Sequence, residues 1–399
     1  MLELVWFCAY PLGELKSCLP FKVDATDEHP ATWLVYLKEY LLSTNFPLKL
    51  HIFCISSKIS NDIIIQEKNV YYHLFRSIKL SSPKILKYFL NVIFSSYLST
   101  KILGQVKKIK PSVVTQHGTE TQFRDLINRC NFPALIWIQG LMAKVLTDDF
   151  SRGAIIRKKI ENKIYAKQKY FVAPTRDMQT YIFGINPTAK LINLYYPISN
   201  IAFQLFNEKI AKEYDIVFVG AIIKRKGIED LLTATAKVKL VYPQITIKII
   251  GKGEPKYIEI IQEKIKALGL FSNVIFMGYL PKHVDVLIEI KKAKIFVLPT
   301  HVDTGPRSIA ESMAIGTPVI ANCIDGIPDM IENGKTGRLV KKYNTDELAT
   351  EIINLMNNIQ LRERLGTEAN NEARKLFQGQ KIAEDLIKIY SDLSQSKYE

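Results

Sequence analysis

The sequence predicts an α/β fold made of two doubly wound parallel sheets. The chain has 399 residues, which is more than one hydrophobic core usually organises. Hydrophobic residues make up 47% of it and charged residues 23%, a balance typical of a packed globular chain rather than a disordered one. In the second half, short β-branched runs alternate with amphipathic helical stretches, which favours parallel strands joined by crossover helices.

The alternation is clearest from Asp215 onward, where several runs are apolar throughout, as strands covered on both faces are. The predicted strands are Ile216–Val219, Ile245–Ile250, Val274–Met277, Ile295–Leu298 and Pro318–Ala321. The helices predicted between them are Ile228–Val241, Tyr257–Leu268, Val284–Lys292 and Ser308–Ile315.

The first half repeats the pattern less regularly. Its predicted elements are strands Leu2–Ala9, Lys49–Ser56, Ser112–Thr115, Ala134–Ile138 and Tyr170–Val172, with a helix at Ala31–Ser43. The rhythm lapses between Asn193 and Tyr214, and a last helical stretch runs from Ala369 to Leu393. We therefore expect an N-terminal domain at residues 1–195, a linker at 196–214, a second domain at 215–358, and a helical segment at 359–399 that packs back on the first domain.

Two Rossmann-like domains that face each other across a cleft are the architecture this order suggests. In open α/β sheets, ligands bind beyond the carboxyl ends of the strands. We therefore look for chemistry in the loops that follow strands.

The net charge of +15 is concentrated in the first half. Residues 1–200 hold 26 Lys and Arg against 14 Asp and Glu, whereas residues 201–399 hold 28 against 25. Such an excess fits nucleic acid, anionic lipid or an anionic substrate, and composition does not separate the three.

The five cysteines form no Cys-x-x-Cys pair, so we expect reduced thiols of a cytoplasmic protein. The first residues lack a basic stretch ahead of an apolar one, which argues against a signal peptide. The best apolar stretch, Ile85 to Leu98, is short and interrupted by Lys87 and Asn91, so no membrane span is predicted.

The most informative segment runs from Leu298 to Ala321. A buried strand ends, a polar loop follows, and a helix begins near Pro306, a residue tolerated in the first turn. The start of such a helix attracts a phosphate, because backbone N–H groups and the helix dipole point there. Asp303 and Glu311 flank this start and can accept hydrogen bonds from sugar hydroxyls.

A second loop, Val219 to Gly227, contains the consecutive cations Lys224, Arg225 and Lys226. Cations between a strand and a helix, beside a glycine that allows close backbone approach, form a candidate diphosphate clamp. A lysine-rich turn alone is weak support, since most are simply solvated. Both loops are expected at the carboxyl edge of one sheet.

Four motifs in the second half resemble those of the GT4-type retaining glycosyltransferases, which have the GT-B fold. They are Gly220-x5-Lys226-Gly227, Val274-Ile-Phe-Met-Gly278, Asp303-x7-Glu311 with the following Ala-Ile-Gly-Thr-Pro-Val-Ile-Ala, and Asp325-Gly-Ile-Pro-Asp329. The first half fits more loosely, through the segments Pro111–Gly118 and Pro133–Gly140.

The resemblance implies that Glu311 holds the ribose of a nucleotide-sugar donor, that Asp303 faces the donor sugar, and that Lys226 binds the diphosphate. The donor-binding set it implies is Gly220, Lys224, Arg225, Lys226, Gly278, Thr304, Gly305, Pro306, Arg307 and Glu311. The catalytic set it implies is Asp303, Glu311, Lys226 and His117.

Three positions depart from the family pattern. The arginine usual after the strand glycine is Ala221, so Arg225 or Lys224 has to supply that charge. The first acidic residue is Asp303 instead of Glu, and the usual histidine of the Pro133 segment is Gln139. The acceptor side is expected to contain Gly13, His29, His117 and Gln139.

The basic residues of the first half form two clusters that we expect to meet an anionic membrane surface. The first comprises Lys79, Lys84, Lys87, Lys101, Lys107, Lys108 and Lys110, interleaved with apolar and aromatic residues, and the second comprises Arg157, Lys158, Lys159, Lys163, Lys167 and Lys169. The alternative is a helix whose lysines are merely solvated.

Together with these features, the resemblance implies a retaining glycosyltransferase that uses a UDP- or GDP-sugar and a glycan or lipid-linked acceptor, in cell-surface polysaccharide or glycolipid assembly. We expect no cofactor and no metal, because no Asp-x-Asp motif lies at a strand end. We expect a cytoplasmic location, at the cytosolic membrane face, and no nucleic acid. The alternatives are a nucleotide-sugar 2-epimerase of the same fold and a nucleic-acid-binding protein that uses the basic first half.

Overall fold

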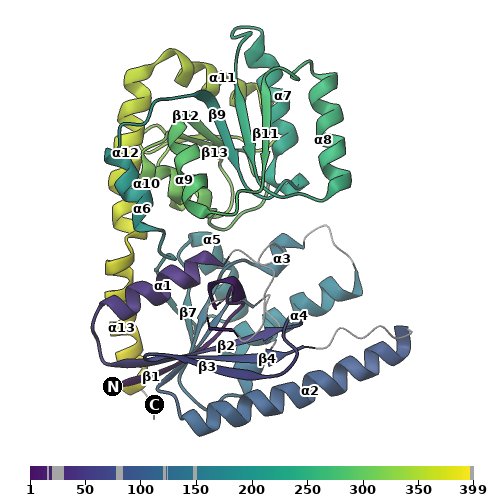
Figure 1. The fold of residues 1–399 in the computed structure, drawn as a ribbon, viewed down its shortest axis with the longest axis vertical. Helices are drawn as coiled ribbons and strands as arrows, with labels where there is room; N and C mark the ends of the chain where they lie inside the picture. Colours follow the sequence, from purple (N-terminus) through teal and green to yellow (C-terminus); the bar gives the residue numbers. More distant parts are fainter. Residues whose placement is uncertain are drawn as a thin grey trace. The chain divides into compact units, whose positions relative to one another are not determined.

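A computed structural model describes residues 1–15, 18–19, 31–77, 84–119, 123, 125–146 and 151–395, with the side chains of residues 84–95 left aside. The chain forms two compact units (Figure 1). The first contains Met1–Pro174, Met178–Tyr196 and Gln380–Glu399, and the second contains Thr175–Asp177 and Pro197–Gly379.

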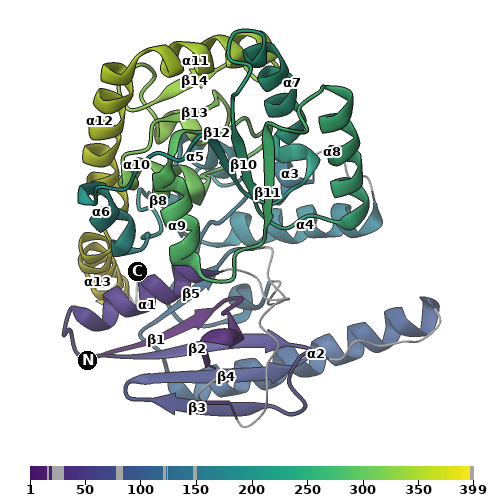
Figure 2. The same cartoon turned by 45° about the horizontal axis from the view of Figure 1, so that its top comes forward.

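The first unit is built on an eight-stranded sheet with the order β3-β4-β2-β1-β5-β6-β7-β8. Its strands are β1 (Leu2–Phe7), β2 (Leu48–Ser56), β3 (Ile63–Glu67), β4 (Val70–Arg76), β5 (Val113–His117), β6 (Ala134–Trp137), β7 (Tyr170–Val172) and β8 (Lys190–Ile192). All pairs are parallel except the β3–β4 hairpin at one edge, which Figure 2 shows beside β2. This hairpin was not predicted from the sequence.

Helices cover both faces of this sheet. They are α1 (Thr32–Ser43), α2 (Lys84–Ile109), α3 (Met142–Val145), α4 (Arg152–Lys167), α5 (Arg176–Ile185) and α13 (Gly379–Gln395), with short 3-10 helices at Leu12–Leu15 and Leu126–Arg129. Because side chains alternate along a strand, Trp6 packs in the core shared with α1 and α13, whereas Phe7 packs in the core shared with α2, α4 and α5.

The last helix, α13, belongs to the core of the first unit. Leu386 and Tyr390 are buried there beside residues of β1 and β2. The hydroxyl of Tyr390 accepts from Nε1 of Trp6 at 3.0 Å and from Oγ1 of Thr115 at 3.0 Å. The helical stretch predicted at Ala369–Leu393 is two helices, because the backbone of Gln378 is extended between α12 and α13.

The second unit is built on a six-stranded parallel sheet with the order β11-β10-β9-β12-β13-β14. Its strands are β9 (Tyr214–Val219), β10 (Ile247–Ile250), β11 (Val274–Gly278), β12 (Ala293–Leu298), β13 (Val319–Asn322) and β14 (Arg338–Val340). The five predicted strands are therefore confirmed with small shifts at their ends, and β14 was not predicted.

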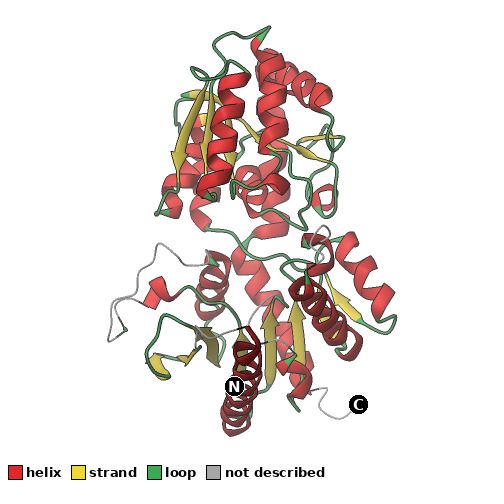
Figure 3. Ribbon diagram, turned by 90° about the vertical axis from the view of Figure 1, so that its right-hand side faces the viewer, coloured by secondary structure: helices red, strands yellow, loops and turns green. Residues whose placement is uncertain are grey.

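The helices of the second unit lie on both sides of its sheet (Figure 3). They are α6 (Asn200–Asn207), α7 (Ile228–Lys239), α8 (Pro255–Ala267), α9 (His283–Lys292), α10 (Arg307–Ile315), α11 (Thr345–Asn357) and α12 (Ile359–Phe377). Helix α7 packs beside α8 and α11, whereas α10 packs beside α6, α9 and α12. Among the described helices, none combines the length and apolarity that crossing a bilayer requires.

Candidate functional site

The first part of the candidate site is the turn that follows β9. A short 3-10 helix, Lys224–Lys226, ends at Gly227, whose φ is +73°. A Cβ atom at Gly227 would lie 1.8 Å from the carbonyl oxygen of Pro299, so the turn can approach the end of β12 only because this residue is glycine. The glycine thus brings the three cations of the turn to the loop after β12.

Arg225 is bonded to that loop through its backbone and its side chain. Its carbonyl oxygen accepts from the backbone N–H of His301 at 2.7 Å, and its guanidinium donates to the carbonyl oxygen of Val302 at 3.2 Å. Ala221, the position of the missing arginine, is exposed. Arg225 therefore holds a charge at the carboxyl edge of β9 and β12, which are neighbouring parallel strands.

Lys226 forms an ion pair with Asp303, in which Nζ meets Oδ2. Both side chains are largely buried, with about one seventh of each exposed. The two predicted residues, 77 positions apart, therefore meet in the structure.

The motif Asp325-Gly326 fixes the loop around Asp303. The carboxylate of Asp325 accepts from the backbone N–H of Asp303 at 3.0 Å, and Asp303 accepts from the N–H of Gly305 at 3.3 Å. A Cβ atom at Gly326 would lie 2.1 Å from the carbonyl oxygen of Thr304, so this approach also requires glycine. Thr304 and Pro306 are buried, whereas Gly305 is exposed.

Glu311 is the buried carboxylate of the site. It lies in α10, which begins after Pro306 and ends at Gly316 with φ +77°, as the sequence predicts. Its Oε1 lies 2.7 Å from Nε of Arg307 and 2.9 Å from Nε2 of His283. Burial would raise its pKa, but the two basic groups and their hydrogen bonds outweigh burial and lower the pKa to about 2.

Two histidines of this site were not predicted from the sequence. His283 begins α9, shortly after Gly278, whose φ of +65° turns the chain at the end of β11. His301 follows β12, and its Nε2 lies 2.7 Å from a carboxylate oxygen of Asp230 in the first turn of α7. Their place beyond the carboxyl ends of strands was the signal that could have identified them.

In the first unit, His117 ends β5 and is fully buried. Its Nδ1 lies 2.9 Å from the hydroxyl of Tyr196, which also accepts from Nε2 of Gln139 at 3.3 Å. His117 and Gln139 therefore converge on the phenol group of Tyr196. Burial lowers the pKa of His117 to about 3, so its ring is neutral at neutral pH.

Aromatic rings surround His117. The ring of Trp6 lies edge-on at 4.6 Å, and that of Trp137 lies stacked at 5.6 Å. Among the described residues, no group bonds to Nε2 of His117.

Gly13 lies in the 3-10 helix after β1, and His29 falls outside the described residues.

The second-unit arrangement has a definite chemical capacity. An ionised, buried carboxylate can only accept hydrogen bonds, and hydroxyl groups supply donors for it. Lys226 and Arg225 provide positive charge at the same sheet edge, which suits phosphate oxygens. A ligand with both hydroxyls and phosphates matches this combination.

Comparison with known proteins agrees with this geometry. Residues 201–372 match the family model described as glycosyl transferases group 1. These residues belong to the glycosyl transferases group 1 family. The match covers the whole candidate site of the second unit.

Curated relatives of this glycosyl transferases group 1 domain include the capsular polysaccharide biosynthesis glycosyltransferase CapM of Staphylococcus aureus, 29% identical over 47% of this chain and 51% of that protein. The N-acetyl-alpha-D-glucosaminyl L-malate synthase of Bacillus anthracis is 24% identical over 75% of this chain and 71% of the relative. The chain spans about half the length of several curated relatives that it matches.

Solved structures of glycosyltransferases share the fold over almost the whole chain. Sucrose-phosphate synthase from Thermosynechococcus elongatus superposes with a TM-score of 0.78 at 18% identity, covering 99% of this chain and 100% of that one. Anabaena HepE in complex with UDP gives 0.69 at 16% identity, covering 98% and 100%. The predicted fold, GT-B with two parallel-sheet domains, is confirmed.

Proposed function

We propose that this protein is a retaining glycosyltransferase that moves a sugar from a nucleoside-diphosphate sugar to an acceptor hydroxyl. The observation that carries the proposal is the buried Glu311 carboxylate, which Arg307 and His283 keep ionised, and Asp303, the partner of Lys226, lies in the loop that leads into the same helix. This constellation lies within the glycosyl transferases group 1 domain.

Donor binding uses the two kinds of charge in different places. Glu311 accepts hydrogen bonds from the ribose hydroxyls, because an ionised carboxylate has only acceptors. Arg307 and His283 both contact Oε1, and they hold the carboxylate in one orientation before the donor arrives. The binding of the hydroxyls then needs little reorganisation of the site.

Cleavage of the sugar–phosphate bond is assisted by the cations. The leaving nucleoside diphosphate gains negative charge while the sugar becomes oxocarbenium-like, so a cation that touches the phosphate stabilises the transition state more than the ground state. Lys226 has three N–H donors, and its pair with Asp303 uses one of them. Asp303 in turn faces the donor sugar, and Arg225 adds charge at the same edge.

Retention follows if the departing phosphate takes the proton of the acceptor hydroxyl on the same face of the sugar. No carboxylate nucleophile and no metal ion are needed in that route. We assign Gly13, His29, His117 and Gln139 to the acceptor side. His117 is neutral, and in the tautomer whose Nδ1–H donates to the hydroxyl of Tyr196 its Nε2 is a hydrogen-bond acceptor.

UDP-glucose and related donors are the first to test, because the HepE structures contain UDP, glucose or UDP-glucose. Assembly of a cell-surface polysaccharide or glycolipid is the proposed setting, and the name of CapM supports it. Thermal-shift measurements with UDP-, GDP-, ADP- and CMP-sugars identify the donor, since a ligand at 100 times its Kd stabilises by about 2.7 kcal/mol.

The decisive variant is Glu311→Gln. It keeps the shape of the side chain and removes the charge, so we expect loss of the donor-induced shift and of turnover. Exposed Lys388→Gln is the control. Turnover in the presence of EDTA tests metal independence, and proton NMR of the product's anomeric centre tests retention. Wild-type donor binding by Glu311→Gln would overturn the assignment.

We also propose that the first unit docks on anionic membranes through α4. Ile155 and Ile156 are about half exposed there, beside exposed Arg157 and Lys159. Apolar side chains next to cations suit an anionic lipid surface. In α2, by contrast, Lys101 is already paired with Asp62 at 2.5 Å, and the side chains of Lys84 and Lys87 lie outside the described residues.

Sedimentation with phosphatidylglycerol–phosphatidylcholine vesicles tests this surface. Replacing Ile155 and Ile156 by Asn should weaken binding about tenfold or more, because the favourable free energy of moving the two isoleucine side chains into the lipid interface is lost. Phe183→Asn, another half-exposed apolar residue of the same unit but on α5, is the matched control. Equal binding of all three proteins would refute the docking surface.

A further inference from the structure

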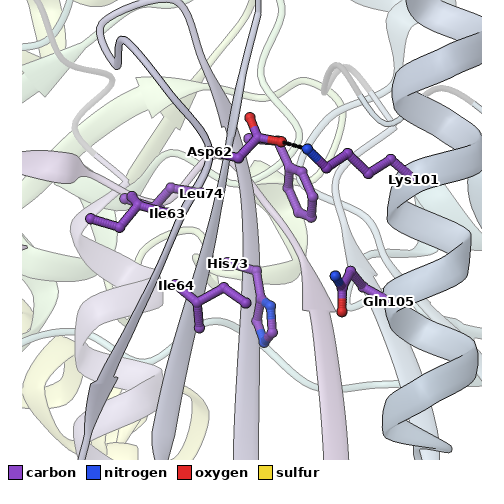
Figure 4. Close-up of a pocket in the computed structure, with 8 residues that line it drawn as sticks. Asp62, Ile63, Ile64, His73, Leu74, Lys101 and Gln105 are labelled. Carbon is purple, nitrogen blue, oxygen red and sulfur yellow. Dashed lines mark ion pairs between the residues drawn. The ribbon is translucent and has the colours of Figure 1, made fainter.

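A cavity of about 140 Å³ lies in the first unit, between the β3–β4 hairpin and α2 (Figure 4). It is lined by Asp62, Ile63, Ile64, His73, Leu74, Phe75, Lys101 and Gln105. None of these residues belongs to the site proposed above. The cavity is open enough to admit a ligand from solvent, and a closed cavity of similar size holds a molecule of about six heavy atoms.

His73 is the buried polar side chain of this cavity. Only 5% of the residue is exposed, and its ring stacks on Phe53 at 4.4 Å. Its Nε2 lies 2.9 Å from Nδ1 of His51, and Nε2 of His51 lies 2.8 Å from Oε1 of Glu3. Its other nitrogen, Nδ1, is buried, and among the described residues no group bonds to it.

The chain of contacts determines which nitrogen carries each proton. The carboxylate of Glu3 accepts, so Nε2 of His51 carries the proton that it donates. Nδ1 of the neutral His51 ring is then an acceptor, and His73 must donate to it through Nε2–H. The remaining nitrogen of His73, Nδ1, therefore presents a lone pair.

The charges of the cavity balance. Burial lowers the pKa of His73 to about 4 and also lowers the pKa of His51, so both rings are neutral at neutral pH. Lys101 and Asp62 form an ion pair at 2.5 Å, drawn as a dashed line in Figure 4. The carboxylate of Asp62 also accepts from the backbone N–H of Arg76 at 2.7 Å. The residues that line the cavity therefore carry no uncompensated charge that would attract an anion or a cation.

The remaining lining combines apolar walls with one amide. Ile63, Leu74 and Phe75 offer apolar surface, and Gln105 extends from α2 toward the strands in Figure 4. A hydroxyl group can donate to His73 and accept from an amide N–H at the same time. A ring that carries hydroxyls at its edge and C–H groups on its face can therefore contact both the polar groups and the apolar walls of the cavity.

We propose that this cavity binds an uncharged, hydroxyl-bearing ligand that places about six heavy atoms inside it, either a small polyol or the edge of one sugar ring whose remainder lies in solvent, and that a hydroxyl of this ligand donates to Nδ1 of His73. The ligand is a free sugar or polyol, or one sugar unit of a glycan. The two sites share no residue: all the lining residues of the cavity belong to the first unit, whereas the donor residues belong to the second.

The test is NMR of protein labelled with ¹⁵N at histidine, titrated to about 50 mM with glycerol, glucose, galactose or N-acetylglucosamine, a range that detects millimolar Kd values. At least one probe should shift the Nδ1 resonance of His73 saturably. A trisaccharide of the same sugar that binds more tightly indicates a glycan unit, and one that fails to bind indicates a free sugar or polyol.

Two variants locate the binding. His73→Phe keeps a ring against Phe53 and removes the acceptor, so saturation-transfer signals from the bound probe should fall at least tenfold. Ile64→Trp fills the cavity from its exposed rim and should have the same effect with the His73 resonance retained. Gln66→Trp, on the same exposed side of β3 but outside the lining, should bind as wild type does.

Three results would overturn the proposal. One is the absence of any probe-dependent shift of His73 at the highest concentration, which would leave water as the occupant. Another is binding that survives Ile64→Trp, which would place the probe elsewhere. The last is a response to inorganic phosphate alone, which would make the cavity an anion site.

Discussion

The guanidinium of Arg307 donates through Nε to Oε1 of Glu311 at 2.7 Å, one turn along α10. His283 reaches the same oxygen from α9, and its Nε2 lies 3.1 Å from the guanidinium. The carboxylate is thus both buried and charged, and its two basic partners offset the cost of burial.

Arg307→Gln is predicted to weaken donor binding about tenfold or more, because removing one partner leaves a buried charge incompletely paired. The KM for the nucleotide sugar and its Kd by calorimetry measure this effect. Arg307→Lys keeps the positive charge but lacks the planar guanidinium group with its several donors, so it should recover only part of the lost donor affinity. Unchanged KM in Arg307→Gln would contradict the role of this pair.

The pairing of Glu311 with Arg307 also predicts that the stability of the fold depends on pH in the acid range. The folded pKa of about 2 lies below the value of 4.5 for a free glutamate, so the contribution is complete above about pH 4.5 and is lost as the pH falls toward 2. The shift corresponds to roughly 3 kcal/mol. The free energies of unfolding of the wild type and of Glu311→Gln, measured in urea, should therefore become more similar as the pH falls from 4.5 to 2.

The Lys226–Asp303 pair predicts strong coupling in a double-mutant cycle. Lys226→Met and Asp303→Asn should each lower kcat/KM about 100-fold, because each removes a group proposed to contact the donor and disturbs the other. The double variant should lose much less than the product of the two single losses. Losses that simply multiply would show that the two side chains act independently.

Gly227→Ala is predicted to destabilise the second unit by about 2 kcal/mol or more, lowering its Tm by about 4–8 °C. The reason is a positive φ together with a Cβ atom placed 1.8 Å from the Pro299 carbonyl. Calorimetry measures the shift. Gly305→Ala, where no heavy atom lies within 4 Å of the new Cβ, should retain the wild-type Tm.

His117 is predicted to stay neutral to below pH 4, since burial lowers its pKa to about 3. In the unfolded chain it titrates near 6.5, so its contribution to stability is present above that pH and is lost as the pH falls from 6.5 toward 3. The ¹³Cε1 shift of the histidine reports its protonation directly. A midpoint near 6 in the folded protein would contradict the burial argument.

Leu386→Ala is predicted to cost the first unit about 2–5 kcal/mol, because α13 supplies part of the core of that unit. Chemical unfolding followed by tryptophan fluorescence is suitable, since Trp6 contacts the same helix through Tyr390. Lys388→Ala, an exposed neighbour on α13, should have little effect. Equal stability of both variants would show that the first unit folds without this helix.

Much of the second unit followed from local patterns. Each strand of the region from β9 to β13 is a short apolar run, and each helix between them has a polar face, so their order and type could be read from the sequence. The loops after β9 and β12 were expected at one sheet edge, and the parallel pairing of these strands confirms it. Gly316 and Pro306 gave the ends of α10 correctly.

The β3–β4 hairpin was missed for a physical reason. Ile63–Glu67 is a mostly exposed edge strand whose apolar run stops after three residues, and the run of its buried partner β4 is interrupted by two tyrosines and a histidine, so neither shows the continuous apolar pattern of a strand covered on both faces. The short strand β14, Arg338–Val340, was missed because three residues carry almost no periodicity. His283 was missed because a lone histidine at a helix start has no local signature of a distant carboxylate.

The sequence by itself determined the fold class, the order of the second sheet's elements, and Asp303, Glu311 and Lys226 as candidates, because strand burial, helix ends and motif spacing are local properties. Only the tertiary structure decided that Lys226 pairs with Asp303, that Arg307 and His283 keep Glu311 ionised, and that His73 lines a cavity with its Nδ1 buried and without a partner among the described residues. Except for Arg307 and Glu311, which are one helical turn apart, these contacts join residues far apart in the chain, and all of them depend on the packing of strands and helices that fixes distances and removes water.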